Sequence, residues 1–393
     1  MIHDSSATPA MLAPVERRNA LIAIVASAAF VGLTIGYSAP LMALMLEAAG
    51  HSQSVVGLNA AVAAIATIIL GPLMPKLFDR FGLYRSILWA VAVGALALAA
   101  MALWQDLVGW FVLRFLLGAA TTVHWIGSES WLISATEPRH RGKAIALYML
   151  CIAGGFAAGA PLILVFGTDG QIPLLAGAAL CFLAAPAIVV GRNAAPSLPK
   201  APPAAFREAF RRAPLVIAAA LLAGFTDMAA MTHLAIYFQN AGMVQDLAVL
   251  TLTVMLLANL LVQIPLGYLA DRWNRQRMLI GCGVIFAVVP VVVILSSVTA
   301  WHLWPFLVLW GAASLGIYTL ALIVLGDLFP PALVASANAA IVAVYQFGSI
   351  LGQPVGGAGM DLFGNDGLMY VFIAAALLFL GFAAWRRSGA RAA

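Results

Sequence analysis

Twelve long apolar runs constrain what this chain can fold into. In the run from Leu247 to Ala270, for example, twenty-four consecutive residues include no Asp, Glu, Lys or Arg. A helix of about 20 apolar residues spans the hydrocarbon core of a bilayer. We therefore predict an all-α multi-pass membrane protein with twelve transmembrane helices. The runs lie at residues 19–47, 54–75, 83–104, 107–136, 142–166, 171–191, 214–240, 247–270, 277–299, 302–328, 332–360 and 367–386.

The composition also indicates that lipid is the solvent of this chain. Hydrophobic residues make up 64% of its 393 residues and charged residues only 9%, whereas a soluble domain is about 25% charged. The three cysteines stand alone in apolar runs, without the spacing of a disulfide framework or a metal site. We expect the lipid bilayer to be a partner, and we expect neither a metal ion nor a nucleic acid.

The positive charges predict an orientation in the membrane. Nineteen of the twenty Lys and Arg residues fall at the termini or in the loops that share one side if every run crosses the bilayer. The opposite loops contain Asp but no Lys or Arg. Because cytoplasmic loops carry the excess of positive charge, we expect both termini to be cytoplasmic, in a bacterial inner membrane.

Two sequence patterns recur at nearly the same distance along the chain. PLMPKLFDRFGLYRS at 72–86 is similar to PLGYLADRWNRQRM at 265–278, with an offset of 193 at the leading proline and 192 at the aspartate. A glycine pattern that begins at Gly155 recurs 193 residues later. A fixed offset is the signature of an internal repeat. We predict a six-helix half at 1–191, a cytoplasmic linker at 192–213 and a second six-helix half at 214–393.

The repeated charged turn resembles the Gly-x-Leu-Ala-Asp-Arg turn of the major facilitator superfamily, and the resemblance covers nearly the whole chain. Asn274 replaces one glycine of this motif in the second copy, and Pro75 replaces another in the first copy. The resemblance implies two halves that rock around a central site, and a turn that latches the cytoplasmic side in the outward-open state. A role in membrane orientation alone is the alternative. The motif residues are Asp79, Arg80, Arg85, Asp271, Arg272 and Arg275.

Glycines at helical spacing predict two close helix contacts. Gly155 and Gly159 stand four residues apart in the fifth run, and Gly348 and Gly352 do so in the eleventh. Small residues at this spacing let helix backbones approach closely, and a proline inside a helix kinks it. We expect such kinks at the prolines that follow each pair. The fifth-run pattern also resembles an incomplete form of a motif common in proton-driven exporters, although ordinary packing explains it too.

Arg114 is a charged residue well inside the fourth run, and it resembles the arginine of the fourth span in the superfamily. On a helix it shares one face with Thr121 and Trp125, and Glu129 flanks this face further along. A basic group, a hydroxyl, an indole and an acid on one stripe suit a polar substrate cavity. Alternatively, Arg114 caps backbone carbonyls near the outer surface and Glu129 pairs near the cytoplasmic surface.

Asp227 is the deepest acid in the chain, in the middle of the seventh run. Ionisable groups inside a span are costly to place there and are functional candidates by default. We predict that Asp227 binds and releases a coupling proton, with Glu129 as a second candidate. A structural hydrogen bond at a helix interface is the alternative for Asp227. On the same helix His233 and Tyr237 form a separate stripe, and we count both among the cavity candidates.

Three further polar residues inside the runs complete the predicted cavity, namely Tyr37, Asn259 and Tyr318. Spans 1, 4, 7 and 10 line the cavity in the superfamily, which favours Tyr37 and Tyr318. Near the cytoplasmic ends we expect Asp327 to pair with a neighbouring loop. For Asp79 we expect a partner among Arg139, Arg141 and Lys143.

The motifs of several other protein classes are missing from the sequence. We find no nucleotide-binding glycine loop, no HExxH, no GxSxG and no Cys/His cluster. We therefore expect no enzyme activity, no catalytic residues and no cofactor. The prediction is a monomeric secondary transporter of a small organic molecule, coupled to protons and working by efflux. An importer of a carboxylate or zwitterion is the closest alternative, followed by a non-transporting sensor of the same fold and a membrane-embedded transferase.

Overall fold

The structure is a computed structural model that describes residues 14–136, 140–194, 206–329 and 331–392. Every regular element in these ranges is helical. Twelve helical segments are long and apolar enough to cross a membrane. The prediction of an all-α protein with twelve spans is therefore confirmed.

The first six spans comprise nine helices, because three of the spans are interrupted. Span 2 breaks at a 3-10 turn over Gly71–Leu73, span 5 breaks around Pro161, and span 6 breaks at Leu183. The helices are α1 (Pro14–Ala48), α2 (Gln53–Leu70), α3 (Met74–Phe81), α4 (Leu83–Leu103), α5 (Leu107–Ala135), α6 (Arg141–Gly159), α7 (Leu162–Phe166), α8 (Ile172–Phe182) and α9 (Ala184–Val190).

The last six spans are single helices, and a short helix in the predicted linker precedes them. Residues 195–205 of that linker lie outside the described residues. The helices are α10 (Phe206–Arg212), α11 (Pro214–Asn240), α12 (Gln245–Arg272), α13 (Arg275–Leu295), α14 (Leu303–Leu328), α15 (Pro331–Phe363) and α16 (Gly367–Ala392).

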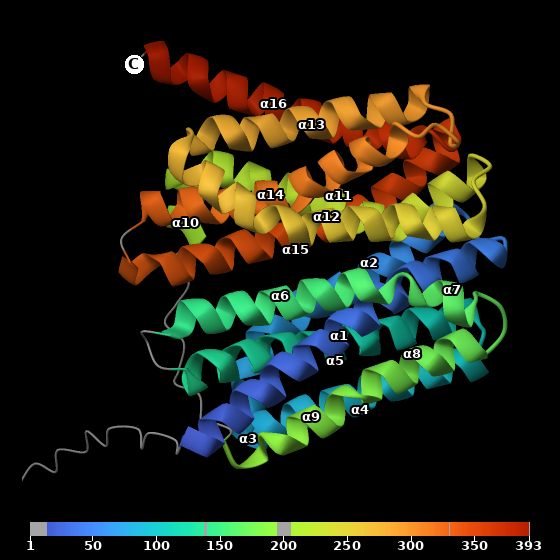
Figure 1. Cartoon of the computed structure of the whole chain (residues 1–393), viewed down its shortest axis with the longest axis vertical. Helices are drawn as coiled ribbons and strands as arrows, with labels where there is room; N and C mark the ends of the chain where they lie inside the picture. The colour runs from blue at the N-terminus through green and yellow to red at the C-terminus, as the bar shows by residue number, and fades with distance from the viewer. Residues whose placement is uncertain (1–13, 137–139, 195–205, 330, 393) are drawn as a thin grey trace, which may run out of the picture.

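The helices gather in two bundles that lie side by side. In Figure 1 helices α1 to α9 occupy the lower half of the view, and α10 to α16 occupy the upper half. Within the first bundle α1 packs along α6, and within the second α11 packs along α15. The main contact between the bundles is that of α2 with α15. We call these bundles the N-terminal and C-terminal halves.

The four glycines predicted at helix contacts lie at equivalent seams in the two halves. Gly155 and Gly159 of α6 lie against the backbone of α1, and Gly348 and Gly352 of α15 lie against the backbone of α11. A Cβ atom at any of these positions would collide with main-chain atoms of the facing helix. Each pair of helices can approach this closely because the glycines have no side chain.

The two prolines near these seams behave differently. The helix of span 5 stops at Gly159 and restarts at Leu162, on either side of Pro161. By contrast, α15 runs unbroken through Pro354. Near this proline α15 meets a helix on each side: α11 packs against Gly352, and α2 approaches the backbone of Pro354.

The charge distribution distinguishes the two ends of the bundles. We call the end with the Lys- and Arg-containing loops the basic side and the opposite end the acidic side. Helix α1 begins on the basic side and ends on the acidic side, and α2 and α5 both run from the acidic to the basic side. In Figure 1 the basic side lies to the left.

Replacement of Gly352 by alanine tests the seam between α11 and α15. The added methyl group would meet the backbone of Phe225, which cannot move aside as a side chain can. We expect Gly352→Ala to reduce the free energy of unfolding by on the order of 1–3 kcal/mol. The unfolding midpoint of the purified protein should fall accordingly. Gly381→Ala is the matched control, because a methyl group there meets open space. Equal midpoints for the two variants would contradict the close contact.

Candidate substrate and proton site

Asp227 lies at the middle of α11, half-buried, where three helices of the C-terminal half meet. Ser314 of α14 donates a hydrogen bond to its Oδ1 atom. Tyr345 of α15 donates to its Oδ2 atom at 3.3 Å. The carboxyl group therefore links α11 to two helices that pack around it.

Tyr318 of α14 extends this polar cluster. It follows Ser314 by one turn of α14, and its ring packs against that of Tyr345 with centroids 5.3 Å apart and planes at 69°. Glu129 of α5 belongs to the N-terminal half and is half-buried. The two acids that the sequence suggested as proton carriers thus lie in opposite halves, with Asp227 bonded to this tyrosine pair through Tyr345.

The rest of the α5 stripe is arranged around hydrogen bonds within the N-terminal half. Thr121 donates to the carbonyl oxygen of Gly118 in its own helix, at 2.9 Å. Trp125 is half-buried and packs against the core of the N-terminal half. Beside Glu129, the hydroxyls of Ser128 and Tyr148 are 2.8 Å apart.

Arg114 is buried nearer the acidic side, with 6% of its surface exposed. Its Nη1 atom donates to the sulfur of Met42 at 3.2 Å. Its Nε atom has no hydrogen-bond partner among the described residues. Among the described residues, we see no hydrogen bond from Arg114 to a backbone carbonyl and no ion pair with an acid. The alternative in which Arg114 caps backbone carbonyls is therefore not seen in this structure.

Three of the residues predicted to line the cavity are buried, and each has a hydrogen-bond partner within its own half. Tyr37 is fully buried and donates to the carbonyl oxygen of Pro173 at 2.9 Å, within the N-terminal half. His233 is fully buried, with Nε2 at 2.9 Å from the carbonyl oxygen of Gln353. Tyr237 is 3% exposed and donates to Asp366. Asn259 is half-buried on α12.

A carboxylate joins the two halves at the acidic side. Asp361, at the end of α15, accepts hydrogen bonds from the backbone N–H groups of Gln53 at 2.9 Å and Ser54 at 2.8 Å. It also accepts one from the Ser54 hydroxyl at 2.5 Å. These donors form the first turn of α2, so a negative charge from one half stabilises a helix N-terminus of the other.

Further contacts around this carboxylate close the acidic side. Glu47 of the N-terminal half accepts a hydrogen bond from Asn240 of the C-terminal half at 2.8 Å. Along the same face, Gly57 of α2 lies against the backbone of α15, and Gly357 of α15 lies against the backbone of α2. In the sequence, the only signal of Asp361 is its place among the aspartates of the acidic loops.

The motif turn of the C-terminal half forms an ion-pair cluster on the basic side. Arg275 Nη1 is 2.6 Å from both carboxylate oxygens of Asp327, and Nη2 is 3.4 Å from Asp271. The guanidinium of Arg272 lies over the ring of Tyr268 at 4.0 Å. Asp327 thus pairs with a neighbouring loop, as expected. These contacts join α12, α13 and α14, all within one half.

The motif turn of the N-terminal half makes no corresponding cluster among the described side chains. Asp79, Arg80 and Arg85 are exposed, and Arg80 stacks on Phe81. Of the partners expected for Asp79, Arg139 lies outside the described residues, as does the side chain of Arg141. Between these two motif turns we see no bond across the halves, whereas the acidic side is joined by several.

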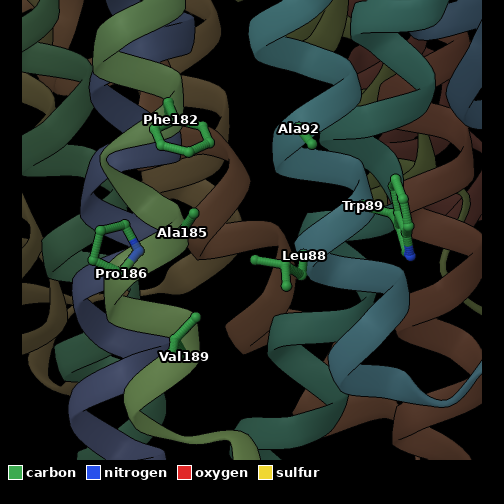
Figure 2. Close-up of a pocket in the computed structure, with 7 residues that line it drawn as sticks. All are labelled: Leu88, Trp89, Ala92, Phe182, Ala185, Pro186 and Val189. Carbon is green, nitrogen blue, oxygen red and sulfur yellow. The ribbon is translucent and has the colours of Figure 1, made fainter.

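A groove of about 590 Å³ on the N-terminal half is a different kind of feature. Figure 2 shows that side chains of α4 and of α8 and α9 face each other across it. Its lining is almost wholly apolar, with the indole N–H of Trp89 as the one side-chain donor among the residues that line it, and it suits the acyl chains of the bilayer. The lining residues are Leu88, Trp89, Ala92, Phe182, Ala185, Pro186 and Val189.

Comparison with known proteins gives the family. The sequence profile of the Major Facilitator Superfamily matches residues 24–252 and 242–392. The chain belongs to this superfamily of transporters. It is 23% identical over 355 residues to the MFS-type transporter YfkF of Bacillus subtilis (strain 168), with 86% of this chain and 88% of that protein covered. It is 24% identical over 315 residues to the MFS-type transporter YcaD of Escherichia coli, with 79% of each covered.

Solved structures share the fold of this superfamily member. One is a bacterial homologue of the human lysosomal transporter Spinster in an inward-facing, unoccupied conformation, with a TM-score of 0.73 at 12% identity and 95% and 96% of the two chains covered. Another is the nucleoside transporter NupG, with a TM-score of 0.72 at 15% identity and 93% and 96% covered. At these identities the likeness concerns the fold alone.

Cysteine labelling can test whether the carboxylate of Asp361 keeps the acidic side closed. Leu252 is 1% exposed in a cluster that joins both halves, so Leu252→Cys in a background without native cysteines reports opening. We expect Asp361→Asn to increase severalfold the rate at which a membrane-impermeant maleimide from the acidic side labels this cysteine, because a charge-assisted cap is stronger than a neutral one.

Asp106→Asn is the matched control for this experiment. Asp106 also caps a helix on the acidic side, but it accepts from Gly109 of its own half, at 3.0 Å. Its replacement should leave the labelling rate at that of the parent protein. If Asp361→Asn labels no faster than Asp106→Asn, the acidic side does not depend on this contact.

Proposed function

We propose that this protein is a proton-coupled secondary transporter, not an enzyme, that exports a small organic molecule in exchange for protons. In this proposal the membrane is a bacterial inner membrane, and the basic side faces the cytoplasm. The observation that carries the proposal is the position of Asp227 at the middle of the apolar helix α11, hydrogen-bonded to helices α14 and α15. It rests further on membership of a transporter family.

A proton on Asp227 changes the bonds that hold three helices together. The charged carboxylate accepts hydrogen bonds from Ser314 and Tyr345. A protonated carboxyl group gives up part of this accepting capacity and gains a donor. Proton binding and release therefore alter how α11, α14 and α15 are joined, which links the charge of one residue to the packing of its half.

Exchange requires that the proton and the substrate compete for one region. Glu129 and Asp227 contribute acidic groups from opposite halves, and Tyr345, which bonds to Asp227, stacks with Tyr318. When these acids are charged, the region favours a cationic or hydrogen-bonding part of a solute, and when they are protonated it releases it. The partial glycine motif at Gly155 supports export.

Proton-coupled uptake of a carboxylate or zwitterion is the second candidate. The observation that favours it is Arg114, a buried cation whose Nε atom has no acceptor among the described residues. A substrate carboxylate entering from the acidic side would supply one. The direction of transport separates the two candidates, since export is driven by protons moving against the substrate and uptake by protons moving with it.

Replacement of Asp227 by asparagine tests proton coupling in either direction. A ligand is first identified by thermal stabilisation of the purified protein against a library of organic acids, amino acids, sugars, siderophores and drugs. In proteoliposomes with a pH gradient, we expect the wild-type protein to accumulate this ligand above equilibrium. Asp227→Asn should still be stabilised by the ligand but should only equilibrate it, because the variant side chain carries no exchangeable charge.

The control for this experiment is Asp169→Asn. Asp169 is an exposed aspartate of the acidic side, away from the three-helix contact, and its replacement should leave accumulation unchanged. Accumulation by Asp227→Asn at the wild-type level would show that another group carries the proton.

A further inference from the structure

At least three buried hydrogen-bond donors of the N-terminal half, on Asn59, Trp110 and Arg114, lack acceptors among the described residues, and those of Asn59 and Arg114 lie on the neighbouring helices α2 and α5. Asn59 of α2 is 1% exposed and Arg114 of α5 is 6% exposed. The Nδ2 atom of Asn59 and the Nε atom of Arg114 have no hydrogen-bond partner among the described residues. Buried polar groups are nearly always paired, so two unpaired donors are an unusual feature.

The packing of α2 on α5 shows how these donors are placed. The two helices run in the same direction, and the hydroxyls of Thr67 and Thr122 meet at 2.8 Å across the seam. One turn toward the acidic side, Gly118 lies directly against the backbone of Ala63. Both contacts join residues 55 positions apart, so the register of the seam is constant over this stretch.

The same register brings Asn59 beside Arg114, one further turn toward the acidic side. Both residues lie on the seam face of their helices, because each precedes the contacts just described by four-residue steps. Met42 of α1 closes the group, with its sulfur 3.2 Å from Arg114 Nη1. Three helices therefore surround two unpaired donors.

The charge of Arg114 is uncompensated in this group. A thioether sulfur is only a weak acceptor, and no ion pair of Arg114 is found among the described side chains. A cation inside the membrane normally pairs with an acid or with backbone carbonyls. The chemistry that completes the group is a compact negative charge that accepts from both an amide and a guanidinium.

We propose that Asn59 and Arg114 form a binding site for a compact monoanion between α1, α2 and α5. The anion is a carboxylate group of the transported substrate or a small inorganic ion such as chloride. The site is separate from Asp227; with a substrate carboxylate as the anion it rests on the second candidate function, and with an inorganic anion it goes beyond both candidates. It lies behind α2, the helix whose first turn Asp361 holds, so movement of α2 gives access to it from the acidic side.

Thermal unfolding of the purified full chain tests the site directly. The reference buffer contains only a bulky sulfonate anion, and chloride, acetate or lactate replaces it at constant ionic strength. We expect a saturable rise in the unfolding midpoint of the wild-type protein, since a ligand that binds only the folded state stabilises it. Arg114→Gln should lose this response, and Asn59→Leu should weaken it at least severalfold.

Asn59→Asp provides an independent arm that does not depend on loss of stability. This nearly isosteric change places a fixed negative charge beside Arg114. We expect the variant to unfold at a higher temperature than the wild-type protein in the reference buffer, and to gain nothing from added anions. Stabilisation of the wild-type protein by chloride assigns the site to an inorganic ion, and stabilisation by carboxylates alone assigns it to the substrate.

Two results would overturn the proposal. One is an anion response of Arg114→Gln equal to that of the wild-type protein. The other is that Asn59→Asp unfolds at a lower temperature than the wild-type protein and is still stabilised by added anions. Asp227→Asn separates this test from that of proton coupling: it should keep the full anion response even though it no longer drives accumulation.

Discussion

The contact between α2 and α15 is the interaction on which the observed conformation depends. Glycines on both helices let their backbones meet, and Asp361 then reaches the free N–H groups at the start of α2. Without the glycines the carboxylate would be held away from these donors. Without the carboxylate, a helix N-terminus would face the closed interface without its charged partner. The glycine contacts and the hydrogen bonds of Asp361 together close the acidic side. On the basic side, the described contacts of the motif turns stay within one half.

Both halves carry ionisable groups inside their spans, and Asp227 and Arg114 differ most clearly in their partners. In the C-terminal half Asp227 is bound by hydroxyl groups of two neighbouring helices. In the N-terminal half Arg114 has only a sulfur contact. The acid is thus partnered within its own half and suits a proton, whereas the base lacks an acceptor and suits an anion. In the cycle that we propose, the two groups would serve different ligands at different depths.

Much of the architecture follows from the sequence, because lipid imposes simple rules on it. Span number follows from apolar runs, and the repeat follows from a constant offset; both seams at Gly155 and Gly348 were visible as small residues at helical spacing. The contacts made by individual polar residues could not be predicted from these rules. Tyr37 lies on a cavity-lining span of the family but turns toward α8. The position of Asn59 beside Arg114 follows only from the register of α2 against α5. Periodicity places a residue on a face, and only packing between distant segments shows what that face meets.

Transport by alternating access requires that the closed acidic side exchange with a closed basic side. Double electron–electron resonance can follow this exchange, with one spin-label pair at Trp104 and Trp301 on the acidic side and another at Phe81 and Trp273 on the basic side, all exposed positions. Measured in nanodiscs at low and at high pH, the two pairs should change in opposite directions, with one distance lengthening as the other shortens. Distances that stay fixed, or that lengthen together, would contradict alternating access around this contact.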